Sequence, residues 1–382
     1  MKISQVCIRY YPALGGVEEY VKRISEYQAD NGDDVRVYTS NLKYHFSNQT
    51  IEDGPSVYNG VKIYRYPILP VRFKKYSVSL ELFSKLVKDD ADIIHAHSYM
   101  YFSADAAGII SRINKKPMVF NPYISELGPP SILGVFYRNT FGKLLMSSDV
   151  VVIISDYEKK VISDWGYTPK RYEKVPPGVD TEEIKNVKRN IFKERGIKGK
   201  VILYAGRLDN NKGVDVLVKA YKLIQEKNRD LNLVIAGPDF GSLEDLKKLA
   251  GMLGVREKVA FLNDLNREEL LSAYKNSHIF AFPTRYEAFG IVMIEAIACG
   301  LPVVATRCSA VPYVLNENSE ALMFKKDDHA ELAKKIIEID ENNGLRNNLV
   351  KNGQKRVNDD YIWDKSLKKM EGIYKSLIKK NK

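Results

Sequence analysis

Cysteine is scarce in this sequence, and long apolar runs are missing. The 382 residues include three cysteines, Cys7, Cys299 and Cys308. This odd and scattered set excludes a disulfide-stapled scaffold and lacks the paired spacing of a zinc site. The longest apolar runs, such as residues 150–154, are far shorter than the roughly 20 residues of a membrane-spanning helix. The N-terminus shows no secretory-signal pattern, so we expect a cytoplasmic protein.

Acidic charge is also in short supply, because 59 Lys and Arg residues outnumber 48 Asp and Glu residues and leave a net charge of +11. Residues 1–186 carry 24 basic and 22 acidic side chains, a difference of +2, which leaves +9 for residues 187–382. Such a balance suits phosphate-bearing partners. The cations are dispersed, however, and no helix-turn-helix, RRM or zinc-finger pattern is present, so we expect no nucleic-acid partner.

The chain has the composition of a soluble globular protein, with 45% hydrophobic and 28% charged residues. Short apolar runs alternate with amphipathic helical patterns, which is typical of parallel sheets buried on both faces. The alternation stops at the charged stretch 179–200 and then starts again. The predicted strands are residues 5–8, 35–38, 61–64, 93–95, 118–120, 150–154, 201–205, 231–236, 258–262, 279–282 and 302–305.

This organisation predicts two Rossmann-like α/β domains, residues 1–186 and 187–360. Open α/β sheets bind ligands at the carboxyl ends of their strands, so we expect a cleft where those ends of the two sheets face each other. Apolar side chains recur every three or four residues near the end of the chain, which predicts an amphipathic helix within residues 361–382.

Three motifs each follow a predicted strand and precede a predicted helix. The first contains Gly15, Gly16 and Glu18. Paired glycines let a backbone approach a ligand closely, and the N-terminus of a helix attracts anions. A plain glycine turn is the alternative, because the G-x-G-x-x-G spacing of a dinucleotide site is missing.

The second motif, residues 205–213, places Arg207 and Lys212 between Gly206 and Gly213. Arginine binds phosphates bidentately and lysine binds them as a point charge, so this loop suits a diphosphate. Because Lys212 precedes Gly213, the motif is not a Walker P-loop. Solvated surface charge is the alternative.

The third motif, residues 283–296, contains Glu287 and then Glu295 inside an apolar helical pattern that follows Gly290. A carboxylate among apolar side chains is costly unless it is paired or hydrogen-bonded. Glu295 therefore either accepts bonds from internal partners or binds ligand hydroxyls, and the sequence leaves both open.

Together these motifs resemble the family 4 glycosyltransferases of GT-B fold. The shared features are G-G-x-E after the first strand, G-R-L…K-G at the start of the second domain, the E-x7-E spacing of Glu287 and Glu295, and V-P-P-G-V-D-T at residues 175–181. The resemblance implies two facing Rossmann-like domains and a terminal helix that returns to the N-terminal one. It also implies transfer of a hexose from a nucleotide sugar with retention of configuration.

The resemblance implies roles for individual residues as well. Arg207 and Lys212 would hold the donor diphosphate and stabilise its growing charge, helped by the backbone of the first motif. Glu287 would bind the sugar, and Glu295 the ribose of the nucleotide. The other donor-binding residues so implied are Gly15, Gly16, Glu18, Gly206, Ala288, Phe289, Gly290 and Ile291.

No metal and no cofactor is then required. Asp90-Ala91-Asp92 resembles the D-x-D of metal-dependent transferases, but it directly precedes a predicted strand. We expect these two carboxylates to cap the preceding helix or to face solvent, and we predict a metal-independent enzyme.

Histidine is where the sequence departs from the family. His95 and His97 match a common H-x-H, and we interpret His95 as a core residue and expect His97 to reach the cleft. Tyr123 stands where the family usually has a functional histidine. Tyrosine can donate a hydrogen bond to a sugar hydroxyl, but its pKa lies about three units above neutrality, which makes it a poor proton shuttle. We predict catalytic-site roles for His97 and Tyr123.

The acceptor is suggested by residues 71–88, which combine aromatic and aliphatic side chains with five cations and one acidic residue, Glu81. Residues 132–146 have a similar character. Basic amphipathic segments with aromatics can lie in an anionic membrane surface, although core helices of a Rossmann-like domain look alike. Membrane contact would suit a lipid-linked sugar or glycan acceptor and a peripheral location at the inner face of the cell membrane.

Two other interpretations stay open. One is a catalytically silent paralogue that binds sugar nucleotides or glycans, which Tyr123 suggests. The other is a GT-B nucleotide-sugar epimerase, which would need no acceptor, although the E-x7-E spacing beside G-R-L…K-G argues against it.

Overall fold

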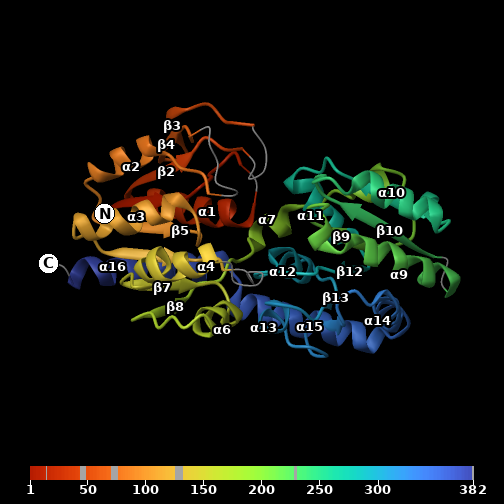
Figure 1. The fold of residues 1–382 in the computed structure, drawn as a ribbon. Coiled ribbons are helices and arrows are strands. Elements are labelled where there is room, and N and C mark those ends of the chain that lie inside the picture. Colours follow the sequence, from red (N-terminus) through yellow and green to blue (C-terminus); the bar gives the residue numbers. More distant parts are fainter. Residues whose placement is uncertain (14, 44–48, 70–75, 125–131, 228–229, 381–382) are drawn as a thin grey trace. The chain divides into compact units, whose positions relative to one another are not determined.

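The chain forms two compact units, residues 1–176 with 364–382 and residues 177–363 (Figure 1). The computed structural model describes the chain except residues 14, 44–48, 70–75, 125–131, 228–229 and 381–382. The first unit ends at residue 176, which is ten residues before the domain boundary that the sequence predicts after residue 186. Helix α7, Thr181–Asn186, belongs to the second unit because Glu183 accepts hydrogen bonds of 3.1 and 3.0 Å from Arg267.

The first unit contains an eight-stranded sheet among the described residues, in the order β3-β4-β2-β1-β5-β6-β7-β8. All neighbouring strands are parallel except the β3 and β4 pair. The central strands are apolar and buried on both faces, as strands covered by helices must be. The strands are β1 Lys2–Val6, β2 Asp34–Ser40, β3 Gly54–Tyr58, β4 Val61–Tyr66, β5 Ile93–His97, β6 Met118–Asn121, β7 Val150–Ile153 and β8 Tyr172–Lys174.

Helices connect these strands, and the last helix of the chain joins them. Met370, Tyr374 and Leu377 of α16 are buried, and the Tyr374 hydroxyl accepts a hydrogen bond of 3.0 Å from Gln5 Nε2 in β1. This contact confirms the predicted return of the terminal helix to the N-terminal domain. The described helices are α1 Gly16–Asp30, α2 Leu80–Val87, α3 Phe102–Ile113, α4 Ile132–Tyr137, a π-helical turn Arg138–Gly142, α5 Lys143–Met146, α6 Asp156–Asp164 and α16 Trp363–Lys380.

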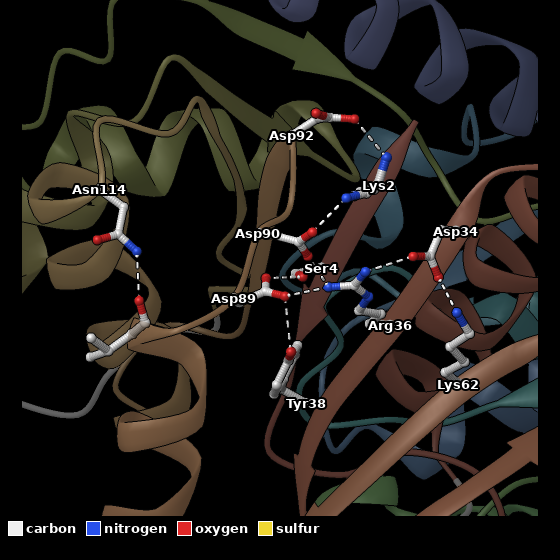
Figure 2. Close-up of polar contacts among 11 residues, drawn as sticks. Lys2, Ser4, Asp34, Arg36, Tyr38, Lys62, Asp89, Asp90, Asp92 and Asn114 are labelled. Carbon is white, nitrogen blue, oxygen red and sulfur yellow. Dashed lines mark hydrogen bonds and ion pairs between the residues drawn. The ribbon is translucent and has the colours of Figure 1, made fainter.

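The amino ends of β1 and β2 carry an ionic network (Figure 2). Arg36 donates to Asp34 at 2.6 Å, to Asp89 at 2.9 Å and to Asp90. Asp90 also pairs with Lys2 at 2.5 Å, and Asp92 accepts the Lys2 backbone N–H at 2.7 Å. The two D-x-D carboxylates therefore bind cationic and backbone donors at the amino edge of the sheet. Ligand sites of open α/β sheets lie at the opposite edge.

The second unit contains a six-stranded parallel sheet within the described chain, in the order β11-β10-β9-β12-β13-β14. The strands are β9 Lys200–Ala205, β10 Leu231–Ala236, β11 Val259–Leu262, β12 Ile279–Phe282, β13 Val303–Thr306 and β14 Leu322–Phe324. Its helices, besides α7, are α8 Ile191–Glu194, a 3-10 turn Asn210–Lys212, α9 Val214–Lys227, α10 Leu243–Met252, a 3-10 turn Arg256–Lys258, α11 Arg267–Asn276, α12 Ile291–Ala298, α13 Val311–Val314, α14 His329–Glu341 and α15 Asn343–Asp360.

Each unit is thus a Rossmann-like domain, and in each the predicted motifs follow a strand. Because β9 and β12 pair side by side, the loops after them lie at the same carboxyl edge of the second sheet. These two loops carry the second and third motifs.

Candidate functional site

The second unit brings Lys212 and Glu287 together at this edge. Lys212 Nζ lies 2.8 Å from Glu287 Oε2, and each side chain is 16% exposed. The Glu287 carboxylate also accepts the backbone N–H of Ala288 at 3.0 Å. Burial alone would raise the pKa of Glu287, but the Lys212 ammonium lowers it below its usual value. The two side chains therefore form an ion pair at neutral pH.

Helix α12 begins at Ile291, four residues after Glu287 in the sequence. Gly290, in the left-handed conformation with φ of 91°, precedes Ile291, the first residue of the helix. The first backbone N–H groups of a helix have no partner within it and carry a partial positive charge, which suits an anion. The Phe289 side chain is part of the hydrophobic core. Its buried ring packs edge-on against Tyr361, with ring centroids 5.4 Å apart.

Arg207 shares a loop with Lys212 but has different surroundings. Its side chain is 53% exposed, and its guanidinium lies 3.5 Å from Asp209 and 5.2 Å from the centroid of the Phe240 ring. The neighbouring Gly206 N–H donates to Ala236 O at 2.9 Å and so continues the strand pairing. The loop therefore offers one exposed cation, Arg207, and one held by a carboxylate, Lys212.

Glu295 has internal partners. Its two oxygens accept hydrogen bonds from Arg267 at 2.5 Å and from Tyr274 at 3.3 Å, and the side chain is buried in α12. Of the two possibilities that the sequence leaves open, the structure shows the internal one. Because Arg267 of α11 binds both Glu295 in α12 and Glu183 in α7, Arg267 links three helices.

In the first unit, the first motif is built around another buried carboxylate. Glu18 lies in the first turn of α1 and pairs with Arg9 at 2.6 Å. The Glu18 carboxylate folds back over Gly15, where an added Cβ would lie 2.1 Å from Oε2. A side chain at position 15 would therefore displace the Glu18 carboxylate from its present place, and Arg9 is a partner that the motif did not indicate.

The histidines of β5 are fully buried, which corrects the expectation that His97 reaches the cleft. His97 Nε2 lies 2.7 Å from Gln5 Oε1, which can only accept, so Nε2 carries the proton. Its Nδ1 then accepts from the Tyr123 hydroxyl at 3.1 Å. Burial lowers the pKa of His97 well below its usual value, and that of His95 to about 3. Both imidazoles are neutral at physiological pH.

Tyr123 directs its hydroxyl proton to His97, so its oxygen is left as an acceptor. Burial raises the pKa of Tyr123 well above its usual value. The residue is in the left-handed region with φ of 47°, which is uncommon for a bulky side chain. The buried Glu158 carboxylate holds the chain just after it, because it accepts the N–H groups of Ile124 and Ile154, each at 2.8 Å.

Both α2 and α4 of the first unit expose apolar side chains, and α4 exposes more of them. Within residues 71–88, residues 71–75 lie outside the described chain, and α2 buries Leu82 and Leu86 against the core but leaves Leu80 62% and Val87 38% exposed. In α4, by contrast, Ile132 is 88% and Phe136 is 63% exposed, with Leu133 also exposed. Residues 132–147 contain Arg138 and Lys143 and no acidic residue. Both segments therefore present apolar side chains at the surface, and α4 presents more of them.

The described residues contain neither a candidate membrane span nor a candidate metal cluster. No described helix is both long and apolar enough to cross a membrane. No cluster of three or more His, Cys, Asp or Glu side chains in the described part of the chain is placed to hold a metal ion.

Comparisons with known proteins agree with the motifs. A family model described as glycosyl transferases group 1 matches residues 187–356, and one described as glycosyltransferase family 4 matches residues 14–183. An uncharacterized glycosyltransferase of Methanocaldococcus jannaschii is 28% identical over 400 residues, which cover 98% of each chain. The D-inositol 3-phosphate glycosyltransferase of Acidothermus cellulolyticus is 26% identical over 95% of this chain and 86% of its own.

The fold has close solved counterparts. Alr3699/HepE of Anabaena, solved in complex with UDP and glucose, superimposes with a TM-score of 0.77 at 17% identity, over 98% of this chain and 100% of the other.

Proposed function

As this chain belongs to the family 4, group 1 glycosyltransferases and has their GT-B fold, we propose that it is a retaining enzyme that moves a hexose from a UDP- or GDP-linked donor. The acceptor we propose is a lipid-linked sugar or a glycan, in glycan or glycolipid assembly. The observation that carries the donor assignment is the Lys212–Glu287 ion pair beside the amino end of α12. Because Alr3699/HepE was solved with UDP, UDP is the first nucleoside diphosphate to test.

The ion pair suits an exchange of partners when a donor binds. A diphosphate offers Lys212 a stronger anionic partner than one carboxylate, and its arrival releases Glu287 to accept a hydrogen bond from a sugar hydroxyl. Arg207 and the N–H groups of α12 add positive charge near the same place in the second unit. Charge that grows on the departing diphosphate is then stabilised by groups already in position, so we propose that no metal is required.

The direct test is a thermal-shift and calorimetric screen of the protein with UDP, GDP, ADP and their sugar conjugates. A ligand at 100 times its dissociation constant adds about 2.7 kcal/mol to stability, so the matching nucleotide raises Tm clearly. Selective stabilisation by UDP or GDP, with turnover of its sugar conjugate, supports the proposal. Binding without turnover indicates the silent paralogue, and absence of any nucleoside diphosphate binding overturns the donor site.

We propose that the acceptor side contacts an anionic bilayer through residues 71–88, as the sequence predicts, and also through α4, which exposes more apolar side chains than α2. Exposed Ile132, Leu133 and Phe136 offer apolar area, and the cations of the same helical segment are not opposed by any acidic residue. Such surfaces bind by burial in the interface together with attraction to anionic lipids. The cytoplasmic leaflet carries negative surface potential, so the inner face of the cell membrane is the surface we propose.

Co-sedimentation with vesicles that contain phosphatidylglycerol tests this surface. We expect Ile132→Asp with Phe136→Asp to weaken binding about tenfold or more, because two apolar contacts are lost and negative charge is added. Val57→Asp is the control, since Val57 is 71% exposed, between Phe136 and Ile132, but lies on β3. Equal binding of the α4 variant and the wild type, or equal loss in the control, would contradict the proposal.

A further inference from the structure

Arg285 is a residue of the third motif to which the family resemblance assigned no role. Its guanidinium donates to Asn210 O at 2.5 Å, to Asp215 Oδ2 at 2.8 Å and to Asp327 Oδ1 at 2.7 Å. Asn210 belongs to the Lys212 loop, Asp215 to the first turn of α9, and Asp327 to the segment after β14. One side chain thus links three segments at the carboxyl edge of the second sheet.

The backbone beside Arg285 holds the same loop. The Arg285 N–H donates to Asn211 O at 2.7 Å, and Thr284 Oγ1, whose proton goes to Tyr286 O at 2.7 Å, lies 3.3 Å from the same Asn211 oxygen. Gly213, which ends the 3-10 turn, lies so close to the chain that an added Cβ would be 2.1 Å from Pro283 O. The carbonyls of Asn210 and Asn211, immediately before Lys212, are therefore both bound by residue 285.

The charge of Arg285 is compensated, unlike that of Arg207. Two carboxylates, Asp215 and Asp327, lie within 2.8 Å of its nitrogens, and its side chain is 26% exposed. A guanidinium so engaged has little left to offer a phosphate. Its bonds instead determine where the loop lies, and the loop determines where Lys212 meets Glu287, two residues after Arg285.

We propose that Arg285 is a positioning residue for donor binding: through its bonds to Asn210, Asp215 and Asp327 it holds the loop that presents Lys212, without contacting the donor. The inference rests on the proposed function, because Lys212 is there a ligand of the diphosphate. Preorganisation of this kind lowers the cost of ordering the loop when the donor binds.

The sign of the effect of Asp327→Asn and Asp215→Asn on nucleoside diphosphate binding tests the proposal. If Arg285 positions the loop, both variants weaken binding, by about three- to tenfold, because one of its bonds loses its charge. If Arg285 binds phosphate directly, the same variants tighten binding, because they remove negative charge and free the guanidinium. Asp327→Asn is the cleaner variant, since Asp215 also lies 3.8 Å from Lys219.

Two further comparisons separate positioning from general stability. Arg285→Lys keeps the charge but cannot bridge three segments, so we expect it to weaken binding nearly as much as Arg285→Gln. In a Lys212→Met background, Asp327→Asn should change the affinity no further, because its effect acts through Lys212. Arg307→Lys is the control. Arg307 forms an ion pair with Glu317, which lies outside the Lys212 loop.

Calorimetry with UDP and GDP, with Tm measured in parallel, gives the readout. Weaker binding at unchanged Tm, absent in the Lys212→Met background, supports the inference. Tighter or unchanged binding in both Asn variants, or full affinity in Arg285→Lys, overturns it while the proposed function stands. A wild-type protein that binds no nucleoside diphosphate overturns the proposed function and this inference together.

Discussion

Lys212→Met and Glu287→Gln are each expected to lower kcat/KM for donor turnover by about 100- to 1000-fold, which corresponds to about 2.7–4 kcal/mol of transition-state stabilisation. The first change removes an ammonium that we assign to the diphosphate. The second keeps the shape of Glu287, and an acceptor for the Ala288 N–H, but removes the carboxylate that we assign to the sugar. Release of nucleoside diphosphate from the sugar nucleotide that stabilises the wild type is the measurement.

The double variant decides whether the pair acts on substrate or on the fold. The two side chains bind each other at 2.8 Å, so a purely structural pair would be lost with the first substitution. The double variant would then be no worse than either single one. If each side chain instead has its own substrate contact, the losses come close to adding. Lys247→Met and Glu244→Gln, an exposed pair with the same 2.8 Å separation, serve as the control and should leave turnover unchanged.

Most strands of both sheets could be predicted because buried parallel strands are short apolar runs. The three strands that the sequence did not predict, β3, β8 and β14, each lie at the edge of a sheet. Strand β3 begins Gly54-Pro55-Ser56, residues that disfavour strands but are tolerated at an edge. Strands β8 and β14 have three residues each, too few to show an alternation.

The candidate site shows a different limit. Glycines and charged residues after strands indicated the loops correctly, because a strand followed by a helix has only one edge at which to place them. Most partners of the polar side chains at these sites could not be predicted, since those partners are distant in sequence. Tyr374, which meets His95 at 2.6 Å, is 279 residues away from it, and Arg285 binds residues 42 to 75 positions away. His97 likewise meets Gln5, which is 92 residues away from it.

The largest effect of pH on stability is expected where burial keeps a histidine neutral. His95→Gln should be less stable than the wild type at pH 7.5, by about 1–2 kcal/mol, because glutamine replaces the hydrogen bonds to Asn121 and Tyr374 imperfectly. Below pH 6.5 the difference should shrink and, near pH 5, reverse. The reason is that the pKa of His95 in the folded protein is about 3, against the ordinary value of 6.5 in the unfolded chain.

The direction follows from proton uptake. Between pH 6.5 and 3 the unfolded chain binds a proton at His95 and the folded protein does not, so acidification favours unfolding by about 1.4 kcal/mol per pH unit. Glu158 and Asp105 act oppositely, because burial raises their pKa values to about 7 and about 6 and the folded protein takes up their protons first. The wild type alone therefore shows a muted pH dependence, whereas its difference from His95→Gln isolates the histidine.

Urea denaturation from pH 7.5 to pH 5 measures this difference. Leu377→Ala is the control, because it removes buried apolar volume from α16 without removing a titratable group. Its loss of about 2–5 kcal/mol should stay constant across the range. A His95→Gln difference that is equally constant would mean that the folded protein binds the proton as readily as the unfolded chain. The assignment of His95 and His97 as neutral would then be wrong. The tautomer of His97 that makes the Tyr123 oxygen an acceptor would be wrong as well.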